Sequence, residues 1–160
     1  MALDAGLDPI WDQEVRRSCA RAGLQCGLRL ASHRGALTPV NLLWLRLGAS
    51  ENLLGTTTEH LGGRRVGGRL LVHDPVVRTQ VAHAVSEQLV VEAELGGLDG
   101  APDEATLARL HRSVTDVDRL LLRLLGGHSF LAEGPGADAM LSESLRDRVA
   151  AAGHLPEVAP

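Results

Sequence analysis

Helical periodicity is the feature of this sequence that most limits how the chain can fold. Apolar residues recur every three or four positions in five segments, which lie at about 9–32, 39–61, 75–96, 103–125 and 137–152. Helix-start signals precede four of them, namely Asp8-Pro9, Thr38-Pro39, Asp74-Pro75 and a lone Asp103. Glycine pairs follow three of the segments, as expected where helices end. The pattern predicts helices joined by short loops.

Composition supports the same fold class. Leu, Val and Ala supply nearly all of the apolar residues, while the chain has one Phe, two Trp and no Tyr. Helices favour Leu, Ala and Arg, whereas sheets favour aromatic and β-branched residues. We therefore predict a single all-α domain over residues 1–160, an antiparallel four-helix up-and-down bundle with a short extra C-terminal helix. Residues 1–35 supply an N-terminal helix, and the glycine pairs near residue 65 mark a turn.

The apolar stripes of three helices indicate their inner faces. The segment 39–61 is apolar on most sides, so we expect it to be central and to need a second copy or a partner chain to cover it. On the segment 75–96 the stripe contains, in order, Val77, Val81, Ala84 or Val85, and Gln88 or Leu89. On 103–125 the spacing alternates between three and four, which is typical of helix packing in bundles, at Leu107, Leu110, Val114, Val117, Leu121 and Leu124.

Charge and cysteine content argue against several classes of function. The formal net charge is -4 and all 16 basic residues are Arg, which argues against general binding of nucleic acid. A membrane-spanning helix needs a run of about 18 uncharged apolar residues, and the sequence contains none. No signal-peptide pattern opens the chain, so we expect a cytoplasmic protein. Cys19 and Cys26 lie about 10 Å apart on one helix, too far for a disulfide. No His pair has the spacing of a zinc site, so no metal is predicted.

Two segments carry a resemblance to a known family. Residues 65–78, which begin with Arg65, resemble the segment Arg-x-Phe-Gly-(Lys/Arg)-Pro-Leu followed by Gln-x-Val-Arg of the acyl-CoA dehydrogenases. Residues 121–131, which contain Gly126 and Gly127, resemble the turn Leu-Gln-x-Leu-Gly-Gly-His-Gly-(Phe/Tyr) of the same family. A helix pair of the right length separates the two segments. The chain therefore resembles the C-terminal helical domain of these enzymes.

The resemblance covers about residues 36–150 and implies a role in flavin binding. In that family a helical domain and a β domain precede the bundle, and FAD lies between the β domain and the bundle. The two segments reach the adenine dinucleotide of FAD, often across a subunit boundary. The resemblance thus implies that Arg65, Gly126 and Gly127 bind the cofactor. An Arg fork can bind a pyrophosphate, and glycine lets an anion approach backbone N–H groups closely.

Several positions depart from the family's pattern. Gly67 stands where the family has Phe, and Ser129 stands where it has Gly. Pro75 and Arg123 stand where the family has Gln. These losses favour a bundle that no longer takes part in redox chemistry. The retained Arg65 and the glycine pair instead favour a subunit related to the dehydrogenases.

No catalytic base can be carried over from the family. At one of the two places where these enzymes have their carboxylate, this chain has Val40 and Asn41, neither of which is a base. The region of the other place has no counterpart here. Glu51 is the remaining candidate, because it lies in an otherwise apolar helix where burial would raise the pKa of its carboxyl. The alternative is that Glu51 faces water.

Two functions of different class remain open. In the first, the chain is the helical subunit of a split flavin-dependent oxidoreductase that acts on CH–CH bonds of an acyl thioester. A second chain then supplies the β domain, the base and half of the FAD pocket, and the isolated chain binds no cofactor. In the second, the bundle is repurposed without redox chemistry, as a stand-alone binding protein or a flavin-independent enzyme of a biosynthetic pathway. We expect a homodimer or a hetero-oligomer in either case.

Overall fold

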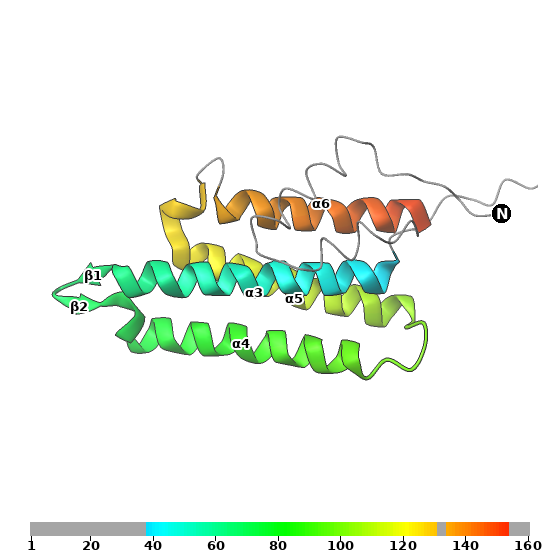
Figure 1. Ribbon diagram of the computed structural model, residues 1–160, viewed down its shortest axis with the longest axis horizontal. Helices are drawn as coiled ribbons and strands as arrows, with labels where there is room; N and C mark the ends of the chain where they lie inside the picture. The colour runs from blue at the N-terminus through cyan, green and yellow to red at the C-terminus, as the bar shows by residue number, and fades with distance from the viewer. Residues whose placement is uncertain (1–37, 131–133, 154–160) are drawn as a thin grey trace, which may run out of the picture.

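Four antiparallel helices make up the structure, a computed structural model that describes residues 38–130 and 134–153 (Figure 1). In chain order they are α3 (Pro39–Gly63), α4 (Pro75–Gly96), α5 (Glu104–Leu125) and α6 (Pro135–Gly153). Short elements join them: the strands β1 (Arg65–Val66) and β2 (Arg69–Leu70) and the 3-10 turns η1 (Leu71–His73) and η2 (Gly126–Phe130). The predicted all-α bundle is confirmed. The helix expected at 9–32 lies outside the described residues, as do Cys19 and Cys26.

Side-chain caps start three of the helices where the sequence predicts. Thr38 Oγ1 accepts from the backbone N–H of Asn41 at 3.1 Å, at the start of α3. Asp74 accepts from two backbone N–H groups at the start of α4, and Asp103 accepts from the third residue after it at the start of α5, at 2.7 Å. Each cap satisfies N–H groups that have no partner inside the helix, which is worth about 1 kcal/mol.

The helix α6 is the fourth member of the described bundle. The sequence suggested a short addition at 137–152, but the helix begins at Pro135 and packs along α3 and α5. Figure 1 shows α4 and α6 on opposite sides of the pair formed by α3 and α5. Within the described residues the four helices therefore run alternately up and down.

The helix α3 is central, as its apolar sequence predicts. It packs against α4, α5 and α6, and its Leu42, Leu43 and Leu47 are at most 2% exposed. Among its large apolar side chains only Trp44 is strongly exposed, at 40%. The apolar sides of α3 that suggested a need for a partner are thus covered within the chain.

The structure decides between the alternatives for the inner face of α4. Ala84 and Gln88 are buried, whereas Val85 and Leu89 are exposed. The buried side of α4 continues through Val91, which packs with leucines of α3 and α5. Two of the three apolar residues among these four, Val85 and Leu89, therefore lie on a second, exposed side of the helix.

The predicted seam of α5 is found over most of its length. Leu110, Val114, Val117 and Leu121 are at most 4% exposed and face α3 and α4. At the end of the helix Leu125 is fully buried, while Leu124 is only partly buried. The last expected position was wrong by one residue, because the 3.6-residue turn of a straight helix drifts from a strict alternation of three and four.

A β-hairpin takes the place of the simple turn expected between α3 and α4. The first glycine pair, Gly62–Gly63, belongs to α3, and the second pair forms the turn. Gly67 and Gly68 have φ values of 58° and 81°, the positive values that a tight two-residue hairpin needs and that glycine adopts at low cost. The strands pair antiparallel, with Arg65 opposite Leu70. The hairpin therefore holds Arg65 in an exposed position at one end of the bundle.

Two adjacent leucines provide a test of the core. Leu125→Ala should lower the free energy of unfolding by about 2–5 kcal/mol, because it removes a fully buried side chain and leaves a cavity. Leu124→Ala should cost about 1 kcal/mol, because Leu124 is partly exposed. Urea unfolding followed by far-ultraviolet circular dichroism measures both values. Equal losses would contradict this assignment of the core.

Candidate functional site

A buried arginine lies at the centre of the bundle. Arg46, in the middle of α3, is 1% exposed. Its Nε donates to Ser142 Oγ of α6 at 3.0 Å, and its Nη2 donates to Thr115 Oγ1 of α5 at 2.8 Å. Its Nη1 contacts the ring nitrogen Nδ1 of His111 at 2.8 Å and donates to the carbonyl oxygen of the same residue at 3.3 Å. The guanidinium is thus satisfied by two helices other than its own.

The environment of Arg46 keeps His111 neutral. The pKa of His111 is lowered to about 4, mainly by burial and in part by the nearby guanidinium groups of Arg46 and Arg146. Because a guanidinium can only donate, Nδ1 of His111 must accept, and the ring proton therefore sits on Nε2. Burial also lowers the pKa of Arg46, while the carboxyl of Asp118 opposes that change. The bundle interior consequently pairs a cation with a neutral imidazole.

Asp118 is the buried carboxyl of the described residues. Its side chain lies on α5, is 6% exposed, and has one oxygen, Oδ1, with no hydrogen-bond partner among them. Burial raises its pKa to about 6, against a hydrogen bond with Ser50 and the charge of Arg46, which lower it. Ser50 Oγ in turn accepts from Gln88 Nε2 of α4 at 3.0 Å. Asp118 can therefore gain or lose a proton close to neutral pH.

These side chains form one region, which we call the core polar network. Its members come from all four described helices and have no more than 8% exposure: Arg46, Ser50, Gln88, His111, Thr115, Asp118 and Ser142. Their hydrogen bonds link α3 to each of the other three helices. A buried polar group without a partner costs free energy, so the network fixes how the helices face one another.

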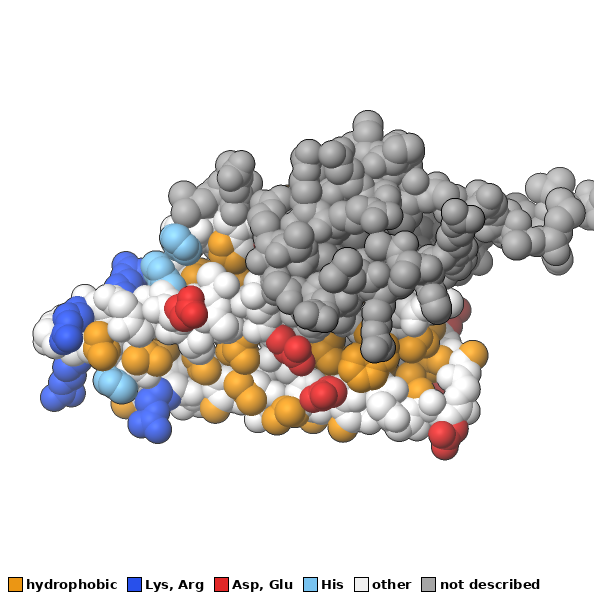
Figure 2. All heavy atoms as spheres, viewed as in Figure 1, with side chains coloured by type: hydrophobic (Ala, Val, Ile, Leu, Met, Phe, Trp, Pro, Cys, Tyr) orange, Lys and Arg blue, Asp and Glu red, His pale blue; other side chains and the backbone are white. Residues whose placement is uncertain are grey.

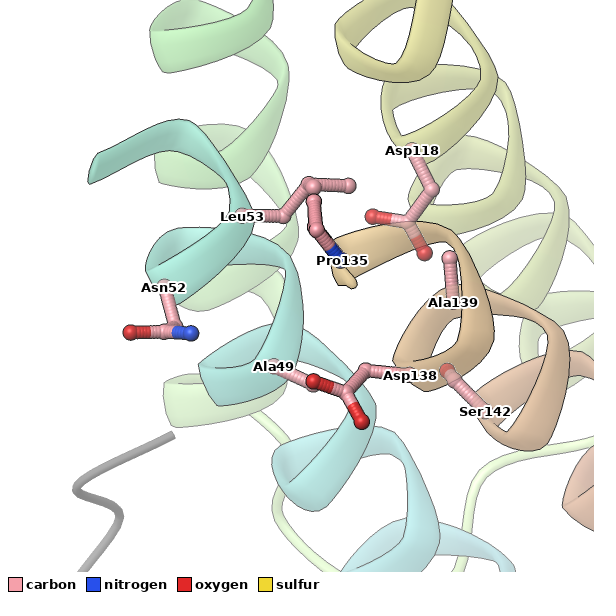
Figure 3. Close-up of a pocket in the computed structure, with 8 residues that line it drawn as sticks. All are labelled: Ala49, Asn52, Leu53, Asp118, Pro135, Asp138, Ala139 and Ser142. Atoms are coloured by element: carbon pink, nitrogen blue, oxygen red, sulfur yellow. The ribbon is translucent and has the colours of Figure 1, made fainter. Parts of the chain in front are cut away.

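A small pocket opens beside Asp118. Residues of α3, α5 and α6 line it: Ala49, Asn52, Leu53, Asp118, Pro135, Asp138, Ala139 and Ser142 (Figure 3). Within this pocket the centre of a water molecule can occupy about 10 Å³. That volume is close to the minimum that one water molecule requires. Figure 3 shows two carboxyl groups at its wall, Asp118 from α5 and Asp138 from α6. A pocket of this size can admit water and allow proton exchange, but it is too small to enclose a substrate or a flavin.

A second region lies at the hairpin end of the bundle, which we call the basic end. His60 of α3 stacks on His128 of η2, with ring centroids 4.7 Å apart and 20° between the ring planes. Partial burial lowers the pKa of His60, and His128 and Arg64 lower it further. Arg65 lies on the adjacent hairpin and donates from Nη1 to the carbonyl oxygen of Gly68 at 3.2 Å. The Arg side chains visible in Figure 2 gather at this end.

The candidate cofactor residues share the basic end. Figure 1 shows the hairpin that carries Arg65 and the turn η2 at the same end of the bundle. Gly126 has a φ of 57° and donates its N–H to carbonyl oxygens of α5, so it ends that helix. Gly127, the next residue, is exposed. The N–H of Gly126 is therefore used by the fold, whereas the exposed backbone at Gly127 faces the surroundings.

The candidate base Glu51 belongs to neither region. It is exposed on α3, and partial burial and the nearby Glu92 of α4 raise its pKa. Of the two arrangements considered for Glu51, the structure has the one that faces water. His83 of α4 is also exposed.

The core polar network was missed in the sequence, although two signals for it were present. Arg46 interrupts the run from Leu42 to Leu47, on a helix that is apolar on most sides, so it had to be buried. His111, Thr115 and Asp118 have the spacing of one helical face, beside the apolar seam of α5. A polar stripe next to a seam and a lone cation on a buried helix together predict an interior network.

No family model matches this chain, and no curated protein or solved structure shows significant similarity to it. Within residues 38–130 and 134–153, no group of three or more His, Cys, Asp or Glu side chains is arranged to hold a metal ion. None of the helices in those ranges has the length and apolarity needed to cross a membrane.

The raised pKa of Asp118 gives a test with a defined sign. A carboxyl whose folded-state pKa of about 6 exceeds its ordinary 3.8 binds its proton more tightly when folded. It therefore reduces the free energy of unfolding as the pH rises through that interval. Asp118→Asn removes this effect, so the free energy of unfolding of the variant should rise by about 2 kcal/mol relative to that of the parent chain as the pH goes from 4 to 7.

Comparison with the parent chain isolates Asp118. The lowered pKa of His111 acts in the opposite direction over the same pH interval, but both proteins contain His111, so its effect cancels in the difference. Asp116→Asn is the matched control, because Asp116 is an exposed carboxyl on the same helix. Urea unfolding at several pH values measures the difference. The same pH dependence in both variants would show that Asp118 is not the responsible group.

Proposed function

We propose that this chain is the helical subunit of a split flavin-dependent oxidoreductase, related to the acyl-CoA dehydrogenases and acting on CH–CH bonds of an acyl thioester. One observation carries the proposal. The two segments that resemble flavin-contacting segments of that family are far apart in sequence, yet both lie at the basic end of the bundle. The stack of His60 on His128 joins the end of α3 to the second of these segments. The up-and-down topology places both connections at one end of the bundle, so the two segments can contribute to a single site.

The chemistry of the basic end suits the anionic part of FAD. Arg64, Arg65 and Arg69 lie within six consecutive residues, and the stretch 60–73 contains no Asp or Glu. These guanidinium groups are exposed, and guanidinium forks bind phosphate oxygens in pairs. The basic end can therefore hold the pyrophosphate of a dinucleotide that is bound mainly by another chain.

The isoalloxazine ring would be held elsewhere. Pockets bury most of the surface of a bound cofactor, whereas the pocket beside Asp118 has room for about one water molecule. In this proposal a partner chain supplies the β domain, the catalytic base and the walls of the flavin site. The present chain contributes Arg65 and the backbone at Gly127 to the dinucleotide end. Glu51 is not needed as the base in this arrangement, and its carboxyl is exposed on the side of α3 that faces Glu92.

A second function is favoured by a different observation. Gly67, which stands where the family has an aromatic ring, has the positive φ that the hairpin turn requires. A phenylalanine would be strained in that conformation. The bundle thus has its own reason to lack the aromatic side chain, which fits a repurposed bundle without redox chemistry. Such a protein would bind a partner or a small anion at the basic end without flavin.

Flavin content separates the two functions. The chain purified alone should be colourless, because two or three phosphate contacts, at about 1.5–3 kcal/mol each, do not overcome the cost of association. Co-expression with a chain that carries the two missing domains should give a yellow complex with one FAD for each pair. An absorbance scan between 350 and 500 nm on both preparations measures this. Stoichiometric FAD on the isolated chain, or a colourless complex, would refute the split-enzyme proposal.

A substitution at the hairpin tests the role of Arg65. In the co-expressed complex Arg65→Ala should weaken FAD retention by roughly 10- to 150-fold, which corresponds to the loss of one charge-assisted contact. Arg112→Ala is the matched control, because Arg112 is an exposed arginine on α5 outside the basic end. Ultrafiltration followed by flavin fluorescence measures the free cofactor. Equal retention in both variants would remove Arg65 from the cofactor site.

A further inference from the structure

The helix α4 carries a second apolar stripe that faces away from the core. Val85 is 36% exposed and Leu89 is 57% exposed, and Ala82 and Ala93 on either side of them are also exposed. Spacings of three and four place these four residues along one side of the helix. Single exposed apolar residues are ordinary, but a continuous stripe of them indicates an interaction surface. We call this set of four residues the α4 stripe.

The fold leaves the α4 stripe at the edge of the bundle. Within the described residues α4 packs mainly against α3 and α5, through its opposite, buried side. Figure 1 shows α4 as the outermost helix on its side, with α6 beyond the central pair. Figure 2 shows hydrophobic side chains continuing along this edge of the molecule.

Charge is distributed unevenly along the same edge. Arg78 is exposed near the start of α4, next to the basic end, whereas Glu92 is exposed near its finish. The loop beyond α4 adds Asp99, and the side chain of Glu94 is engaged by Arg109 of α5. One end of the α4 edge is therefore basic, and the other end is acidic.

We propose that the α4 stripe is the interface between two copies of this chain, packed antiparallel about a two-fold axis near the middle of α4. An antiparallel arrangement sets the basic end of each copy against the acidic end of the other, whereas a parallel arrangement would oppose like charges. A two-fold axis uses the same patch on both copies, so the stripe has to be self-complementary. The charge pattern of α4 meets that condition.

The register follows from the spacing. With the axis close to Glu87, Val85 of one copy faces Leu89 of the second copy. The two-fold axis repeats this contact, with Leu89 of the first copy facing Val85 of the second. Arg78 then lies within about one helical turn of the position that faces Glu92 of the second copy. Ala82 and Ala93 flank the valine and leucine, and their small side chains let the two helices approach closely. The contact is small, so the association is weak and reversible.

Sedimentation equilibrium of the full chain without any partner tests the interface. Small interfaces associate weakly, so the measurement uses a high concentration, roughly 100 μM. At that concentration the mass should approach twice the 17.0 kDa of one chain. Leu89→Glu should raise the dissociation constant at least about 100-fold, since it buries two carboxylates across the axis. Met140→Glu is the matched control, because Met140 is a 72% exposed apolar residue on α6. Circular dichroism checks that both variants fold.

Charge reversal tests the antiparallel arrangement. Arg78→Glu and Glu92→Arg should each weaken the dimer about 10-fold, and the double variant should restore it, because the two groups meet across the axis. A monomeric parent chain would overturn the proposal, as would a dimer that Leu89→Glu leaves intact. Mass that increases only with a flavin-binding partner chain would assign the stripe to that chain and likewise overturn it. The measurement involves no flavin, so its failure leaves the proposed function untouched.

Discussion

The buried guanidinium of Arg46 constrains the whole bundle, because an unpaired cation in this interior would cost several kcal/mol. Ser142 of α6, and His111 and Thr115 of α5, must present acceptors to it at fixed positions. Hydrogen bonds are directional, whereas contacts between leucines tolerate small rotations and shifts. The network therefore sets the rotation and register of α5 and α6 on α3, and the leucine clusters on either side fill the remaining space.

The two polar regions of the molecule differ in their physical character. The core polar network is closed to solvent apart from the pocket beside Asp118, so its charges act on stability and on pH dependence. The basic end is open, and its guanidinium groups are free to meet an anion brought by another molecule. This separation is consistent with a subunit whose interior is structural and whose end takes part in a site completed elsewhere.

The proposed self-association uses α4 rather than α3. The apolar run on α3 pointed to a partner, but the run is covered by the other three described helices. On α4 apolar residues occupy two sides, of which only one is used by the core. The same feature weakened the sequence pattern, because Ala84 or Val85, and Gln88 or Leu89, gave equally good stripes. An ambiguous stripe was thus a sign of a helix with two apolar faces.

The sequence by itself determined the helices, their starts and most of the α5 seam. These features depend on local chemistry: a capping side chain, a proline in the first turn and a period of 3.6 residues. It did not determine that Arg46 would meet His111 and Thr115, since α3 and α5 are far apart in the sequence. Nor did it identify which stripe of α4 is buried. Only the packing of α3, α4, α5 and α6 decided these points, because burial and pairing are properties of neighbours in space.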